Sequence, residues 1–140
     1  MSSCIQLRTE HVELLDICQM LESSITGETR PSSVDLFAVR KRLTAKLIAH
    51  LKAEDWLLYP RLLESKDAHI ASTARAFVEE MGGLAQAFNA YVESWDAFRI
   101  EREWPQYKIE TAGIIAALRC RITRENRELY PLLERLDQAA

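Results

Sequence analysis

The sequence predicts an all-α fold, an up-down-up-down four-helix bundle that forms one domain over residues 1–140. The chain contains only four Gly and four Pro, too few for the many turns of an all-β protein. Apolar residues recur at helical spacing through four long segments. Short polar turns join these segments, and such turns favour antiparallel packing of consecutive helices. A chain of this length can bury a sizeable core.

The first two predicted helices span about residues 5–25 and 34–64. Ser32 or Ser33 can cap the start of the second helix with a side-chain oxygen. Pro60 should bend or loosen this helix, because its ring removes one backbone hydrogen bond. The inward-facing stripes of the two helices consist of Leu7, His11, Leu14, Leu15, Cys18 and Ile25, and of Leu36, Val39, Leu43, Leu47, His50 and Glu54.

The third and fourth predicted helices span about residues 68–98 and 105–136. Gly82 and Gly83 lie in the middle of the third helix, where each Gly costs about 1 kcal/mol relative to Ala. Either a neighbour approaches closely at this point, or the helix is locally soft. Pro131 interrupts the fourth helix in the same way that a proline interrupts the second.

The second half of the chain repeats part of the first. Residues 50–60 align with residues 121–131 through a shared Leu-Tyr-Pro sequence. In this register Glu125 matches Glu54, and Arg121 stands at the position of the histidine that opens the first copy. The repeat therefore predicts two related half-sites, of which the second has lost its histidine.

Polar side chains on the inward-facing stripes form a candidate metal site. His50 and Glu54 lie four residues apart, so both turn toward the core on one helix face. Buried polar groups need partners, and one metal ion can satisfy both. The spacing along the helices also brings the corresponding positions on the first, third and fourth helices to the same level of the bundle. The predicted metal ligands are His11, His50, Glu54 and Glu125.

These motifs resemble the haemerythrin-like, HHE cation-binding family over nearly the whole chain. The resemblance consists of His11 after Leu-Arg-Thr-Glu, then H-x-x-x-E before Leu-Tyr-Pro, then a second x-x-x-E before Leu-Tyr-Pro. It implies a four-helix bundle around a non-haem di-iron centre, with a His from each helix and a bridging carboxylate from each H-x-x-x-E/D motif. It also implies binding or sensing of oxygen or nitric oxide, iron sensing, or iron repair and storage.

Two positions depart from the family pattern, because Met81 and Arg121 stand where the resemblance implies histidine. Met81 is expected to be part of the core, since thioethers favour soft ions. Arg121 has a permanently charged guanidinium whose donors match carboxylates. Placed between Glu54 and Glu125, it would supply the positive charge that iron supplies in the relatives. The alternative is a surface pair with Glu125, its i+4 neighbour; we favour the inward orientation.

The departures predict that a full di-iron centre is absent. The two remaining histidines and two glutamates suit one non-haem iron ion, or Zn or Mn, since mixed nitrogen and oxygen ligands suit these metals. A chain without any metal is the other expectation. The motifs contain no nucleophile with its base, no phosphate loop and no dinucleotide fingerprint, so we do not expect an enzyme.

Charge and composition restrict the partners. A net charge of −3 without a basic run argues against nucleic acid. No stretch is apolar enough to span a membrane, and the N-terminus lacks a signal-peptide core, so we expect a cytoplasmic protein. Trp56, Trp95 and Trp104 fall near predicted helix ends, which indicates core packing or packing between the subunits of a homodimer.

Two functions follow from these observations. The first is a haemerythrin-like protein with a degenerate di-iron site that serves as a non-enzymatic regulatory or interaction module, with a protein partner or small ligand that the sequence does not identify. The alternative is a metal-binding sensor or carrier, with mononuclear or partial non-haem iron, that binds a small ligand such as oxygen or nitric oxide. An enzyme of iron or nitric-oxide metabolism is a weaker third hypothesis.

Overall fold

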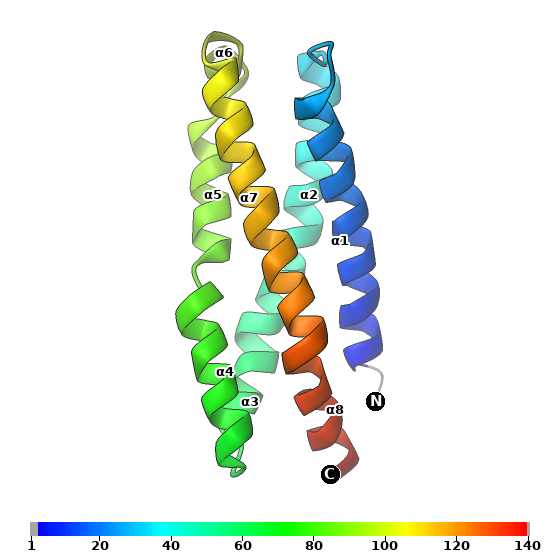
Figure 1. Cartoon of the computed structure of the whole chain (residues 1–140), viewed down its shortest axis with the longest axis vertical. Helices are drawn as coiled ribbons and strands as arrows, with labels where there is room; N and C mark the ends of the chain where they lie inside the picture. Colours follow the sequence, from blue (N-terminus) through cyan, green and yellow to red (C-terminus); the bar gives the residue numbers. More distant parts are fainter. Residues whose placement is uncertain (1–2, 140) are drawn as a thin grey trace.

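The computed structural model describes residues 3–139, and this part of the chain contains helices and no strand (Figure 1). The predicted all-α class is confirmed. In chain order the elements are α1 (Ser3–Thr26), α2 (Ser33–Ala53), the π-helix η1 (Glu54–Leu58), α3 (Tyr59–Leu63), α4 (Ala68–Met81), α5 (Leu84–Ser94), α6 (Ala97–Arg102), α7 (Trp104–Arg124), the π-helix η2 (Glu125–Leu129) and α8 (Tyr130–Ala139).

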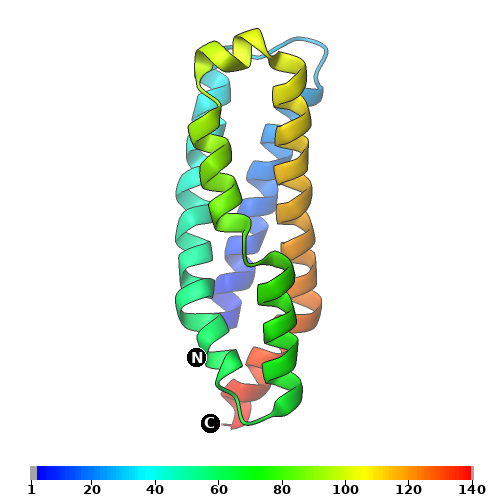
Figure 2. The same cartoon turned by 90° about the vertical axis from the view of Figure 1, so that its left-hand side faces the viewer.

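The elements lie side by side along one long axis. The chain follows α1 in one direction and returns along α2, η1 and α3 (Figure 1). It then follows α4 and α5 to α6 and returns along α7, η2 and α8 (Figure 2). Helix α1 packs against α2 and α7, α3 packs against α4, and α5 packs against α7. Elements from both halves of the chain therefore surround the same interior.

Three of the four predicted helices occur with nearly the predicted ends. The helix predicted over residues 5–25 is α1. The helix predicted over residues 34–64 continues through α2, η1 and α3, and that over residues 105–136 continues through α7, η2 and α8. Ser32 caps α2, since its side-chain oxygen accepts a hydrogen bond from the Asp35 N–H at 3.2 Å.

Pro60 and Pro131 change the hydrogen-bonding register of their helices without ending them. A π-helix precedes each proline by one residue. In η1 the Tyr59 N–H bonds to the carbonyl oxygen of Glu54, five residues earlier, and η2 has the same pattern. Proline has no N–H for the usual i−4 bond, and the wider turn accommodates this loss. The predicted loosening is thus confirmed, and each π-helix begins at a glutamate of the candidate site.

The prediction of one helix over residues 68–98 is wrong. Helix α4 ends at Met81, α5 begins at Leu84, and α6 is a separate helix beyond Ser94. A Cβ atom on Gly82 would clash with the carbonyl oxygen of Val78, so the backbone at this break has room only for glycine. The close contact at Gly82 is with the chain's own preceding turn and not with a neighbouring helix, so the structure favours the alternative of a locally weak helix.

Apolar side chains form two clusters, one on each side of a polar layer. On α1, Leu7 belongs to one cluster and Leu14 to the other, with His11 between them. The pairs that flank the polar layer on the other elements are Leu51 and Leu58, Phe77 and Leu84, and Ile122 and Leu129. Within residues 3–139, no helix has the length and apolar composition needed to cross a membrane.

The predicted role of the tryptophans is confirmed in part. Trp95 is fully buried in the core. Trp104 is half-buried and packs against the same cluster. Trp56, by contrast, is 70 % exposed on η1, so core packing does not explain it.

We predict opposite effects for alanine at the two central glycines. Gly82→Ala should lower the free energy of unfolding by about 1–3 kcal/mol, because the new methyl group meets a backbone oxygen. Gly83→Ala is the matched control: no atom lies within 4 Å of its Cβ position. It should raise stability by about 0.4–1 kcal/mol through a less flexible unfolded chain. Urea unfolding measures both, and equal effects would contradict the assigned contact.

Candidate metal centre

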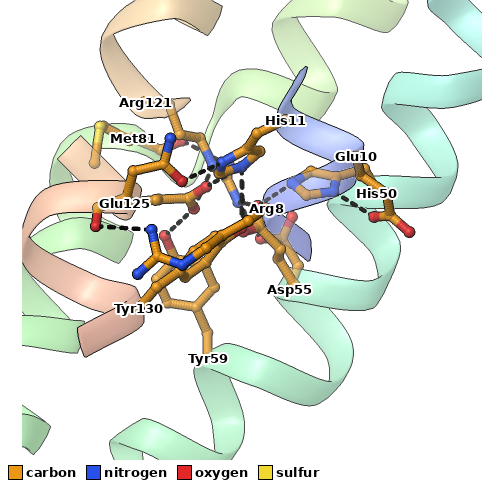
Figure 3. Close-up of polar contacts among 12 residues, drawn as sticks. Arg8, Glu10, His11, His50, Asp55, Tyr59, Met81, Arg121, Glu125 and Tyr130 are labelled. Atoms are coloured by element: carbon orange, nitrogen blue, oxygen red, sulfur yellow. Dashed lines mark hydrogen bonds and ion pairs between the residues drawn. The ribbon is translucent and has the colours of Figure 1, made fainter. Parts of the chain in front are cut away.

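The four predicted ligands meet in the polar layer between the two apolar clusters, and Figure 3 labels three of them, His11, His50 and Glu125. One ligand atom from each residue lies within 4.8 Å of the other three. All four side chains are buried. They come from three of the long helical segments, namely α1, α2 with η1, and η2, and they are His11, His50, Glu54 and Glu125.

Two buried atoms in this layer lack a hydrogen-bond partner. His50 Nε2 lies 3.2 Å from Glu54 Oε1, and His11 Nε2 lies 3.2 Å from Glu125 Oε1. Neither His50 Nε2 nor Glu125 Oε1 forms a hydrogen bond, although buried polar atoms nearly always have one. One ion between these atoms would satisfy both, so the residues fit a single metal ion.

Residues outside the predicted set orient the two imidazoles. The Glu10 carboxylate lies 2.6 Å from His50 Nδ1, and the Asn126 amide oxygen lies 2.8 Å from His11 Nδ1. With Nδ1–H donating to these oxygens, the Nε2 atom of each ring is left facing the layer, as metal-bound histidines require. Sequence reasoning missed both residues, although each is the chain neighbour of a predicted ligand.

Arg121 points into the layer, as predicted, and its side chain is only 2 % exposed. Its Nε donates to Glu125 Oε2 at 3.0 Å. Its Nη2 donates to Glu54 Oε1 at 3.1 Å and to Asp55 Oδ1 at 3.0 Å. The surface orientation that sequence reasoning left open is therefore wrong. One guanidinium joins the glutamates of the two repeats.

Met81 takes part in the site through its backbone. Its half-buried side chain packs against an apolar cluster, as predicted. Its carbonyl oxygen accepts a hydrogen bond from Arg121 Nη1 at 3.2 Å. Helix α4 ends at this residue, and the next helix resumes with the Ala87 N–H bonded to the Gly83 carbonyl oxygen. The break at the glycine pair thus presents a backbone acceptor to the guanidinium.

The two Leu-Tyr-Pro tyrosines bond across the repeat. The Tyr59 hydroxyl donates to Glu125 Oε2 at 2.7 Å. The Tyr130 hydroxyl donates to Glu54 Oε2 at 2.5 Å and lies 2.9 Å from His11 Nε2. Both tyrosines are buried, and sequence reasoning did not assign their hydroxyls to the site. Burial, together with the glutamate charges, raises the pKa of both tyrosines.

The two glutamates differ in acidity. Burial by itself raises the pKa of Glu54, but the nearby imidazole of His50, with a further contribution from Arg121, lowers it to about 2. Burial is the main cause that raises the pKa of Glu125, and the charge of Glu54 adds to it, whereas His11 and Arg121 act in the opposite direction. Burial would lower the pKa of His50, but Glu54 and Glu10 raise it.

The types and positions of the donor atoms in the layer suit one bound metal ion better than two. Imidazole nitrogens and carboxylate oxygens together suit Fe, Zn or Mn, and both imidazoles lie on one side of the layer (Figure 3). In the other half, the guanidinium of Arg121 bonds to both glutamates. A second cation there would lie against a permanent positive charge, so the residues do not fit a di-iron centre.

We predict that Glu54→Ala destabilises the fold by about 3–5 kcal/mol, because it removes a fully buried partner of Arg121. Asp55→Ala is the matched control, since Asp55 bonds to the same Nη2 atom but its side chain is 32 % exposed. Its cost should be about 1 kcal/mol or less. Chemical denaturation of both variants measures the two losses of stability. Equal costs would mean that Glu54 is not the principal partner of the guanidinium.

Comparison with protein families agrees with this geometry. The family model described as "Hemerythrin HHE cation binding domain" matches residues 6–133, which is most of the chain. No curated protein and no solved structure matches the chain. The match extends from α1 into α8. It includes the four predicted ligands and the two positions, Met81 and Arg121, at which the family pattern has histidine. The chain therefore belongs to the hemerythrin HHE cation-binding domain family.

Proposed function

We propose that residues 1–140 form one haemerythrin-like domain, an up-down-up-down four-helix bundle, which binds a single metal ion in a degenerate di-iron site. The proposed ligands are His11, His50, Glu54 and Glu125. The observation that carries the proposal is the pair of buried atoms without hydrogen-bond partners, His50 Nε2 and Glu125 Oε1. Both atoms belong to residues of the group whose ligand atoms lie within 4.8 Å of one another.

The spacing of these atoms supports one ion. Two ligand atoms that each lie about 2.1 Å from one ion, at right angles, are about 3 Å apart. The His11–Glu125 and His50–Glu54 atom pairs are each separated by 3.2 Å. The imidazoles need no rotation, because Glu10 and Asn126 already hold their Nδ1 atoms.

Arg121 takes over the electrostatic role of a second ion. Two ionised glutamates in a buried layer require positive charge, and the guanidinium bonds to both. With this fixed cation present, one metal ion is enough to balance the layer. When bound, that ion would supply a Lewis-acidic position for a small ligand, and we propose non-haem iron, with oxygen or nitric oxide as the ligand class.

The surroundings of the ligands support a non-enzymatic role. A general acid or base needs a polar group that is free to exchange a proton with a substrate. Arg121, Tyr59, Asn126 and Glu10 are each engaged in hydrogen bonds with the ligand residues. We therefore propose a cytoplasmic sensor or regulatory module.

The exposed side of η1 supports a protein partner. Glu54 is the first residue of η1 and is fully buried, whereas Trp56 and Leu57 in the same turn are 70 % and 72 % exposed. A shift of the Glu54 side chain on metal binding would move the backbone of this turn, and with it the exposed Trp56 and Leu57. A second copy of the chain, forming a homodimer, is one such partner.

A metal-free interaction module is the second candidate, and the hydrogen bonds of the site favour it. Arg121, Tyr59 and Tyr130 together supply donors to both glutamates. Only two of the buried side-chain nitrogen and oxygen atoms within the described residues are left without a partner. Metal content separates the two candidates.

We predict one metal ion per chain, without the absorption of an oxo-bridged di-iron centre. Elemental analysis of protein purified without chelators or metal-affinity resin measures the content, and anaerobic titration with Fe(II) measures the affinity. His50→Ala should abolish binding. Two irons per chain would contradict the assignment of Arg121, and no binding by the parent protein would favour the metal-free module.

We also predict that a second ion binds only when the guanidinium is replaced. Fe(II) affinity should rise in the order parent, Met81→His, Arg121→His and the double variant, and only the double variant should bind two ions. Met81→His alone should have little effect, because Arg121 still occupies that half of the layer. Isothermal titration under anaerobic conditions gives affinity and stoichiometry. Equal binding by Met81→His and the double variant would refute this order.

A further inference from the structure

We propose that Tyr130 is a fifth ligand of the bound ion, and that its phenolate oxygen makes the site selective for ferric iron. This inference rests on the proposed metal binding and adds to it the oxidation state that the site prefers. Phenolate is a hard, anionic oxygen donor, and hard oxygen donors favour hard cations such as Fe(III) over softer ones.

The hydroxyl of Tyr130 already lies among the ligand atoms (Figure 3). It is 2.9 Å from His11 Nε2 and 2.5 Å from Glu54 Oε2. Adjacent ligands on one ion are about 3 Å apart, so the phenol oxygen has the spacing of a neighbouring ligand on the same ion. The side chain is fully buried, and its ring stacks on His11 with centroids 5.0 Å apart.

The equivalent tyrosine of the first repeat has a different environment. The Tyr59 hydroxyl bonds to Glu125 Oε2, the same oxygen that accepts from Arg121 Nε. The Arg121 guanidinium carbon lies 5.5 Å from the centroid of the Tyr59 ring. Tyr59 therefore belongs to the arginine half of the layer and Tyr130 to the histidine half.

The backbone and a nearby cation prepare Tyr130 for this role. Its N–H bonds to the carbonyl oxygen of Glu125, so one π-turn holds both side chains in relation to each other. The guanidinium carbon of Arg8 lies 5.4 Å from the centroid of its ring. Arg8 and the stacked His11 ring therefore both lie against the Tyr130 ring and help to fix its position.

When the Tyr130 oxygen coordinates the ion, the hydroxyl loses its proton. The phenol O–H bond breaks, an iron–oxygen bond forms, and the proton leaves to the buffer. No electron is transferred, because the iron is supplied as Fe(III). The parent protein should therefore release one more proton on Fe(III) binding than a variant without the hydroxyl.

The experiment loads metal-free protein with ferric nitrilotriacetate and records visible absorption and resonance Raman spectra. The parent should show a phenolate-to-iron charge-transfer band, with tyrosinate ring vibrations enhanced by excitation in that band. Tyr130→Phe should lose the band, release one proton fewer, and bind Fe(III) about 10–100-fold more weakly. Tyr59→Phe is the matched control and should keep the band. Zn(II) affinity should change less than Fe(III) affinity in Tyr130→Phe.

Each outcome either supports or overturns the assignment of Tyr130 as a ligand. Iron that binds without a charge-transfer band, or a band that survives in Tyr130→Phe, overturns the role of Tyr130 and leaves the single-ion site intact. A band lost only in Tyr59→Phe also overturns it. Circular dichroism checks that the variants fold. Should Tyr130→Phe not fold, the Raman spectrum of the loaded parent decides alone, and missing tyrosinate vibrations refute the proposal. No iron binding by the parent refutes both this inference and the single-ion site.

Discussion

A buried guanidinium shared between two glutamates is the interaction on which the interior of this protein depends. Arg121 is 2 % exposed and bonds to glutamates from both repeats. A charge buried in this way is tolerated only when partners surround it. The end of α4 at Met81 supplies a backbone oxygen for one more donor, so the helix break at the glycine pair is part of the same arrangement.

The repeat is symmetric in backbone and asymmetric in chemistry. Each half contributes a π-helix that begins at a glutamate and ends before a tyrosine. Each tyrosine bonds to the glutamate of the other half, so both carboxylates have hydroxyl donors. Histidines remain on one side only, and arginine stands on the other. One cation of the polar layer is thus covalently part of the chain.

The polar layer divides the apolar interior into two clusters. A layer of this kind stabilises the fold less than apolar side chains of the same volume would, because each charge gives up its hydration on burial. Its retention in the interior of this chain agrees better with a role in binding than with a role in packing. The two partnerless atoms, His50 Nε2 and Glu125 Oε1, identify where a bound ion would lie.

The sequence by itself determined the helical class, three of the four long helical segments, and the inward orientation of the histidines and glutamates, but it left the orientation of Arg121 open. These features depend on the period of the α-helix, which is a local property of the chain. The glycine pair and the two prolines indicated where the helices are weak, but only the structure shows a break at Gly82 and π-turns before the prolines. Tertiary structure alone decided the oxygen partners of each imidazole. Such features depend on the rotation and height of neighbouring helices, which residue spacing along one helix does not contain. The hydroxyl of Tyr130 reaches the ligand atoms for the same reason, since its closest partners lie on α1 and η1.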